Sequence, residues 1–178
     1  MSKILLISGS PRIGNTEFIL RKVFSGLKTK DKKLVLLRTQ KINHCTGCLT
    51  CDKSKKCAIR DDMDKICKLM QWADVYIIGT PNYFDNVSGL LKDFIDRTNP
   101  FYETDILKDK RLIPVIVGGG SVKNSKRVSN EALTYFAAAH KMKIEKAYYF
   151  QALKNNEVKD SAKANQKIAK IIAELNKL

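Results

Sequence analysis

Short apolar runs alternate with segments of helical periodicity along the whole chain. Five runs are apolar almost throughout, as expected for strands that helices cover on both faces. They lie at residues 4–7, 34–37, 75–78, 113–117 and 147–150. Between them, apolar residues recur with the i, i+3, i+4, i+7 spacing of amphipathic helices. These predicted helices cover residues 17–27, 63–70, 87–94, 133–140 and 168–175.

This alternation predicts an α/β fold in a single domain spanning residues 1–178. Five parallel strands with right-handed crossovers form a doubly wound sheet with helices on both faces, and we expect the flavodoxin-like strand order 2-1-3-4-5. That order puts the ligand crevice at the carboxyl ends of the first and third strands. Because Pro114 has no N–H group to donate, we expect the fourth strand to begin near it and the fifth strand to form an edge.

The composition is ordinary for a globular protein: of 178 residues, 44% are hydrophobic and 8% aromatic. The first residues lead directly into a strand, and no apolar run approaches the ~20 residues of a membrane span, so we expect a cytoplasmic protein without a membrane partner. The formal net charge is +15, with lysines spread along the chain. This pattern favours a solvated basic surface over a nucleic-acid site, and an acidic electron-transfer partner such as a ferredoxin would suit it.

The stretch from Ser8 to Thr16 follows the first apolar run and precedes the first predicted helix. A strand, a glycine turn and a helix N-terminus form a phosphate site, because the N–H groups there lack intrahelical partners and the helix dipole is positive at the same point. Gly9 and Gly14 have P-loop spacing, but Asn15 stands where a lysine would reach a triphosphate. The stretch therefore predicts a mononucleotide site that favours FMN. The expected phosphate-binding residues are Ser10, Arg12, Gly14, Asn15 and Thr16.

Three motifs, taken together, resemble the flavodoxin-like NAD(P)H-dependent FMN reductases and the related iron–sulfur flavoproteins. They are Gly9-Ser10-Pro11-Arg12 with Gly14-Asn15-Thr16, Cys45-x-x-Cys48-x-x-Cys51 with Cys57 and Asp61-Asp62-Met63, and Gly79–Phe84 leading to Leu91–Arg97. The resemblance covers most of residues 3–120. It implies one FMN, NADH or NADPH as co-substrate, acceptors such as FMN or quinones, and a homodimer or larger assembly with the flavin near the interface.

Two further loops, after the third and fourth strands, are expected beside the flavin ring. In the family that this chain resembles, the backbone of the first of these loops donates to the polar edge of the ring. Its aromatic residues can pack near the ring, although they can also form a dimer contact or fill the core. The glycines of the second loop permit close approach of the backbone from the other side. The expected residues are Pro81, Asn82, Tyr83, Phe84, Asn86, Gly118, Gly119 and Gly120.

No catalytic side chain is nominated, because a flavin accepts hydride at its own N5 atom while the protein supplies position and electrostatics. With two histidines and no serine–histidine–acid pattern, hydrolytic catalysis has no support. The favoured function is an FMN-dependent oxidoreductase that takes hydride from NAD(P)H. The alternative is an electron carrier in which an iron–sulfur cluster, FMN and a protein partner exchange electrons.

Four cysteines lie within a long connection between the second and third strands. Three thiols at spacing three, with a fourth six residues later, can hold one [4Fe–4S] cluster, because short intervals present successive sulfurs to different irons. Zinc fits less well, since structural zinc sites usually pair two separated knuckles, and free or redox-reactive thiols are the remaining alternative. The candidate ligands are Cys45, Cys48, Cys51 and Cys57, and the nearby charges that would favour cluster reduction are Lys53, Lys55, Lys56 and Arg60.

The other polar residues have structural interpretations. Asp61 and Asp62 are expected to cap the N-terminus of the next helix. Asp96 and Arg97 are expected to form a structural ion pair or a subunit contact. Cys67 falls on an apolar stripe and is expected in the core, and His140 is expected at the surface. The basic loop from Lys123 to Arg127 can meet the 2′-phosphate of NADPH.

Overall fold

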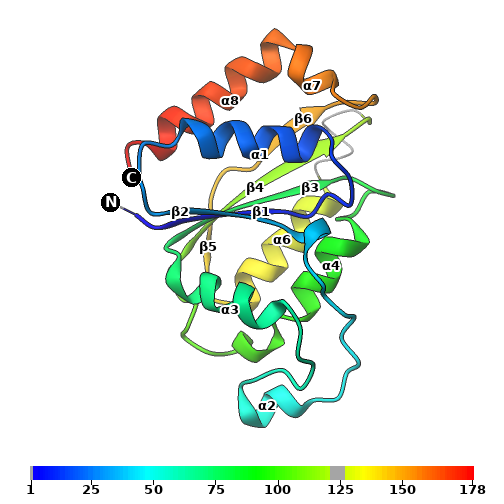
Figure 1. The fold of residues 1–178 in the computed structure, drawn as a ribbon, viewed down its shortest axis with the longest axis vertical. Coiled ribbons are helices and arrows are strands. Elements are labelled where there is room, and N and C mark those ends of the chain that lie inside the picture. Colours follow the sequence, from blue (N-terminus) through cyan, green and yellow to red (C-terminus); the bar gives the residue numbers. More distant parts are fainter. Residues whose placement is uncertain (1, 121–126) are drawn as a thin grey trace.

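The computed structural model describes residues 2–120 and 127–178, which form one parallel sheet flanked by helices (Figure 1). The strand order is β2-β1-β3-β4, and both β5 and β6 pair with β4. The predicted doubly wound order is therefore confirmed. The strands are β1 Ile4–Ser8, β2 Lys32–Leu36, β3 Val75–Pro81, β4 Arg111–Gly118, β5 Lys143–Ile144 and β6 Tyr148–Gln151. The helices are α1 Asn15–Gly26, α2 Thr50–Ser54, α3 Met63–Trp72, α4 Gly89–Asp96, α6 Val128–Ala139, α7 Glu157–Asp160 and α8 Ala162–Leu175, with short 3-10 turns η1 Leu37–Thr39 and η2 Asn99–Phe101.

Each face of the sheet carries its own hydrophobic core. Helices α1 and α8 cover one face, and α3, α4 and α6 cover the other (Figure 1). In β1, Ile4 and Leu6 pack with the first layer, and Leu5 and Ile7 pack with the second. Because both sets of side chains are buried, the strand reads as a continuous apolar run.

The predicted fifth strand, residues 147–150, is β6, and an additional two-residue strand, β5, pairs with β4 just before it. Pro114 explains the interruption between the two. Glu145 N donates to Leu112 O, and Ala152 N donates to Gly118 O, so the even-numbered residues of β4 face β5 and β6. Pro114 faces the same side, where β5 has ended at Ile144 and β6 has not begun. A residue without an N–H group is tolerated there because no strand needs it as a donor. The expectation that β4 begins near Pro114 is therefore wrong, since β4 begins at Arg111.

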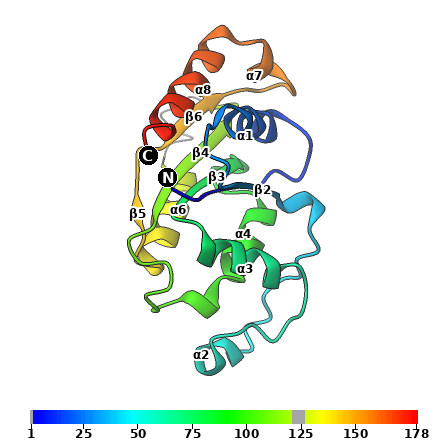
Figure 2. The same ribbon diagram turned by 60° about the vertical axis from the view of Figure 1, so that its left-hand side comes forward.

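The connection between β2 and α3 is the longest excursion from the sheet among the described residues. It leaves the carboxyl end of β2 and carries α2 beyond the layer of α3 and α4 (Figures 1 and 2). No residue of α2 is buried, in contrast to the fully buried β1. Within the described parts of the chain, none of the helices has both the length and the apolarity of a membrane span.

Candidate functional site

The loop between β1 and α1 presents a helix N-terminus that no side chain caps. Gly14 is the N-cap residue, its carbonyl oxygen accepts Phe18 N at 2.9 Å, and no side chain in the described residues caps the first turn. N–H groups at the start of a helix need a partner, and the helix dipole makes an anion a favourable one. The local geometry therefore suits a phosphate, as the sequence predicts.

Four strand ends surround one cavity of about 190 Å³ above this helix start, which we call the carboxyl-edge cavity. Most of the predicted flavin-site residues line it together. These are Ser10, Arg12, Gly14, Asn15, Thr16, Pro81, Asn82, Tyr83, Gly118 and Gly119. The cavity is smaller than the ~300–1,000 Å³ typical of whole-ligand pockets. A cavity of this size suits the phosphate end of a mononucleotide.

Three further residues line this cavity that the sequence did not indicate: Val117, Ala152 and Leu153. Ala152 and Leu153 directly follow β6. Because the carboxyl ends of parallel strands meet at the ligand crevice, their position after the last apolar run could have indicated them. The segment that contains them approaches closely: a Cβ on Gly14 would lie 2.8 Å from Asn155 Oδ1, and one on Gly119 would lie 2.4 Å from Leu153 Cδ2. In both cases the nearest atom is the far end of an exposed side chain, so the segment lies against both glycines but could shift to admit a Cβ.

Some of the predicted side-chain donors already have partners within the protein. Asn15 Nδ2 donates to Lys154 O at 2.8 Å, and Asn15 Oδ1 accepts Val158 N at 3.1 Å. Ser10 Oγ donates to Arg12 O at 2.7 Å. Asn15 therefore joins the phosphate loop to the segment after β6. Thr16, which is buried, also lines the cavity.

The loop after β3 is a tight hairpin whose tip is exposed. Tyr83 and Asn86 exchange backbone hydrogen bonds of 2.9 and 3.0 Å, and Phe84 and Asp85 between them have positive φ angles of 49° and 56°. This backbone favours glycine, so Phe84 stands in a conformation that is costly for its side chain. Phe84 is fully exposed, and Phe84, Asn86 and Gly120 do not line the carboxyl-edge cavity. The alternative that Phe84 fills the core is wrong.

Ser88, at the end of that loop, ties the hairpin to the phosphate loop. Its hydroxyl donates to Gly9 O and accepts Leu91 N at 3.1 Å, so it also caps α4. Gly9 N in turn donates to Gly79 O at 2.7 Å. The two predicted ligand loops are therefore held at a fixed separation by hydrogen bonds.

Glu17, in the first turn of α1, is a buried acid behind the phosphate loop. Its carboxylate accepts Arg38 Nε at 2.7 Å and Arg21 Nε at 2.8 Å. The hydrogen bond from Arg38 lowers the pKa of Glu17 most strongly, against the opposing effect of burial. A negative charge this close to the site is thus neutralised by two guanidinium groups.

The four loop cysteines line a second cavity of about 670 Å³, which we call the cysteine-loop cavity. Cys45 and Cys48 are exposed, and Cys51 and Cys57 are half-buried. Hydrogen bonds from Thr50 lower the pKa of the Cys48 thiol. In the described residues, no group of three or more histidine, cysteine or acidic side chains is close enough to hold a metal. The thiols therefore share a cavity without converging on one point.

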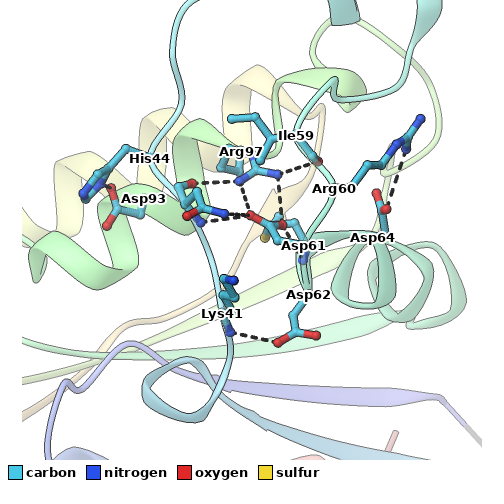
Figure 3. Close-up of polar contacts among 11 residues, drawn as sticks. Lys41, His44, Ile59, Arg60, Asp61, Asp62, Asp64, Asp93 and Arg97 are labelled. Atoms are coloured by element: carbon cyan, nitrogen blue, oxygen red, sulfur yellow. Dashed lines mark hydrogen bonds and ion pairs between the residues drawn. The ribbon is translucent and has the colours of Figure 1, made fainter.

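Arg97 joins the two ends of the cysteine loop (Figure 3). Its guanidinium donates to both carboxylate oxygens of Asp61, at 2.7 and 3.0 Å, and to the carbonyl oxygens of Asn43 and Ile59. Arg97 and Asp61 are both buried, with side-chain exposures of 0% and 1%. Burial alone would raise the pKa of Asp61, but the hydrogen bonds from Arg97, Asn43 and Met63 outweigh it and lower the pKa to about 2.

These contacts correct two expectations about acidic residues. Asp62 Oδ2 accepts Lys41 N at 2.8 Å and makes no capping bond to α3, so its expected capping role is wrong. Asp61 Oδ1 does accept Met63 N at 3.0 Å, but its main partner is Arg97. Asp96 pairs with Lys92 and not with Arg97.

The two histidines occupy different surroundings. Exposed His44 contacts Asp93 at 2.6 Å, and that hydrogen bond raises the pKa of His44. His140 is buried, with Nε2 2.9 Å from Thr98 Oγ1 and its ring edge against Phe136, so the expectation that it lies at the surface is wrong. Cys67 packs against the core as expected, and burial raises the pKa of its thiol to about 12. Residues 123–126 of the predicted basic loop lie outside the described residues.

Solved structures with this architecture show a flavodoxin-like fold. The flavodoxin, WrbA-like protein from Agrobacterium tumefaciens is 17% identical, with a TM-score of 0.66 and 99% of each chain covered. An azoreductase from Bacillus anthracis is 13% identical, with a TM-score of 0.72 and 100% of each chain covered. At these identities the similarity concerns the fold alone.

Sequence similarity identifies the family. Residues 2–156 match the NADPH-dependent FMN reductases, and the chain belongs to that family. An iron-sulfur flavoprotein of Methanocaldococcus jannaschii is 36% identical over 72% of this chain and 70% of its own. An iron-sulfur flavoprotein of Archaeoglobus fulgidus is 36% identical over 66% of this chain, and the match spans 59% of that relative's length.

Proposed function

We propose that the protein is an FMN-dependent oxidoreductase whose flavin is reduced by NAD(P)H and passes electrons to an acceptor. The observation that carries the proposal is the carboxyl-edge cavity, where an uncapped helix start, a buried threonine and two close-approach glycines meet. Backbone N–H groups and short polar side chains suit a single terminal phosphate. The family match supports the choice of FMN.

When bound, FMN would supply the redox chemistry itself. The chain's own task is to bind and orient it. The start of α1, with Ser10, Arg12 and Thr16, would hold the phosphate, and the loops at residues 81–86 and 118–120 would flank the ring. The bond from Ser88 to Gly9 would keep these loops in register. No side chain of the site is required as an acid or base.

FMN titration of the purified protein tests the binding site. Thr16→Val keeps the shape of this buried side chain and removes its hydroxyl. Because a hydrogen bond to a charged group contributes about 1.5–3 kcal/mol, FMN affinity should fall roughly 10- to 100-fold. Riboflavin, which lacks the phosphate, should bind both forms equally. A wild-type protein that ignores FMN and binds a nucleoside triphosphate would refute the proposal.

Stopped-flow mixing with NADPH or NADH tests the reductant. Bleaching of the flavin absorbance within seconds is the expected result. Inertness toward both nucleotides would leave the electron-carrier alternative, in which a protein partner is the electron source. We also propose a homodimer or larger assembly in the cytoplasm. The net charge of +15 favours an acidic acceptor such as a ferredoxin, whose binding should weaken steeply with salt.

A second candidate function adds a [4Fe–4S] cluster that exchanges electrons with FMN. The specific observation in its favour is that all four loop thiols line one cavity, whose volume is about 670 Å³. Thiolates are the ligands that iron–sulfur clusters take. Relatives named iron-sulfur flavoproteins support the same choice. Cys45, Cys48, Cys51 and Cys57 would hold the cluster.

Anaerobic purification followed by iron and sulfide analysis tests this candidate. About four irons per chain are expected for one [4Fe–4S] cluster. Cys57→Ser should reduce the iron content, whereas Cys67→Ser, which changes a core thiol outside the loop, should not. If the wild-type protein stays free of iron after reconstitution, it is a flavin-only oxidoreductase. Retention of one tightly bound zinc would support a structural zinc site instead.

A further inference from the structure

The segment from Arg97 to Asn99 is one of the segments outside the cysteine loop that line the cysteine-loop cavity. It follows α4, and Arg97 and Asn99 both line the cavity together with the four loop thiols. Arg97 is 1% exposed, and Asn99 is half-buried. Neither residue belongs to the cysteine loop, and neither was predicted to act on it.

The guanidinium of Arg97 has one donor to spare. Arginine has five N–H groups. Four bonds from Nη1 and Nη2 go to Asp61, Asn43 and Ile59. Nε is buried and has no partner of hydrogen-bond geometry among the described residues, and Cys57 lines the same cavity as Arg97. A buried N–H group is costly to leave unpaired, so this donor calls for an acceptor.

Asn99 makes a matching contact with a second sulfur. Its Nδ2 lies 3.0 Å from Cys51 Sγ and also donates to Asp52 Oδ1 at 3.2 Å. Thus one short segment brings an N–H group to the sulfur of Cys51 and places a second, unpaired N–H group of Arg97 at the cavity that Cys57 also lines. In this respect it differs from the lysines of the loop, which are exposed.

We propose that Arg97 and Asn99 raise the reduction potential of the cluster by hydrogen bonding to the sulfurs of Cys57 and Cys51. This inference rests on the second candidate function, the [4Fe–4S] cluster. Four thiolates around a 2+ core carry a net charge of −2, and one added electron makes it −3. N–H groups aimed at the sulfurs stabilise that extra negative charge. Because Asp61 neutralises the charge of Arg97, the effect comes from the directed N–H group more than from net charge.

The test is a redox titration of the anaerobically loaded protein, with dithionite as the electron donor and the EPR signal of the reduced cluster as the readout. Arg97→Lys keeps a cation for Asp61 and removes the Nε–H group. Asn99→Leu removes the Nδ2 donor at a half-buried position, so the fold should tolerate it. Each variant should shift the reduction equilibrium about tenfold against the reduced form, which is about 59 mV for a one-electron couple.

Arg60→Lys is the matched control. Arg60 is nearer to Cys57 in sequence than Arg97 is, but its side chain is 68% exposed and pairs loosely with Asp64 at 3.6 Å. The same chemical change there should leave the potential unchanged. Iron content per chain is measured for every variant, so that a change of potential is compared only between loaded proteins.

The outcomes separate the inference from the function on which it rests. If the wild-type protein takes up no iron, the cluster function fails and the inference fails with it. If wild type and all variants contain the same amount of iron, and Arg97→Lys and Asn99→Leu have the same reduction potential as wild type and Arg60→Lys, the inference alone is wrong. If Arg97→Lys does not load, Asn99→Leu decides: a lowered potential supports the inference, and an unchanged potential or loss of loading overturns it.

Discussion

The two cavities are built in opposite ways. The carboxyl-edge cavity is formed at the ends of four strands, and three glycines, Gly14, Gly118 and Gly119, are among the residues that line it. The cysteine loop has no buried residue in α2 and is attached through the side chain of Arg97. The first site therefore depends on close backbone approach, whereas the second depends on one buried ion pair. We therefore expect added side-chain atoms to disturb the carboxyl-edge cavity most, and loss of the ion pair to disturb the cysteine loop most.

Removing the ion pair should have the largest effect. Arg97→Met leaves the carboxylate of Asp61 buried without its partner, and breaking a buried pair in this way costs about 3–5 kcal/mol of unfolding free energy. Lys92→Met, the control on the helix that Arg97 follows, breaks the exposed pair with Asp96 and should cost less than about 1 kcal/mol. Urea denaturation measures both. Equal losses in the two variants would contradict the proposed importance of Arg97.

Acid should weaken the same ion pair. The pKa of Asp61 is about 2 in the folded protein, below its ordinary value of 3.8. The unfolded chain therefore binds the proton first, and the stabilisation is complete above about pH 5 and is lost as pH falls through about 2. The contribution is about 2 kcal/mol. Comparing the pH dependence of unfolding in wild type and Asp61→Asn tests this, because the variant should lose stability less steeply on acidification.

A single methyl group should disturb the carboxyl-edge cavity. In Gly9→Ala the new Cβ would lie 2.7 Å from Leu91 Cβ, which is fixed to the backbone of α4. Overpacking of this kind costs about 1–3 kcal/mol, and FMN binding should weaken as well. Gly119→Ala is the control, since its nearest atom is the flexible end of the exposed Leu153. Thermal unfolding with and without FMN compares them, and a Gly119→Ala variant as unstable as Gly9→Ala would argue against the distinction.

The smallest expected change is at the hairpin tip. Phe84→Gly relieves a positive φ and removes an exposed ring, so the unfolding free energy should stay constant or rise by up to about 1 kcal/mol. If the ring of FMN lies beside this loop, flavin affinity should fall while stability does not. Measuring both on one sample separates these effects. A stability loss of more than about 1 kcal/mol would mean that Phe84 packs against another part of the assembly.

Local sequence predicted the parts of the fold that depend on local chemistry. The apolar runs located the strands, the doubly wound arrangement expected for alternating strands and helices supplied their order, and the Ser8–Thr16 stretch indicated the position of the uncapped helix start. The contacts that were missed join residues far apart in sequence. Arg97 lies 36 residues from Asp61, and Asn15 lies 139 residues from Lys154. An arginine at the end of an amphipathic helix resembles any surface arginine until its partner is located.

His140 illustrates the same limit at one position. It lies at the end of the apolar stripe of α6, where periodicity alone does not distinguish a buried from an exposed side chain. The deciding contact is Thr98 Oγ1, which follows α4 and offers a polar partner within the core. Burial of a polar group becomes acceptable when such a partner is present. The sequence alone does not show that Thr98 and His140 are partners, because the fold brings together residues that are 42 positions apart.

The interruption of the last strand opposite Pro114 makes this edge of the sheet a poor template for strand addition by a second chain. A long exposed edge strand is a template on which a second chain can add its own strand, leading to aggregation. Here the edge consists of a two-residue and a four-residue strand, and the break between them carries Glu145 and Lys146. A foreign strand would meet no continuous ladder of free backbone groups. A proline in β4 thus changes the edge formed by the neighbouring strands β5 and β6.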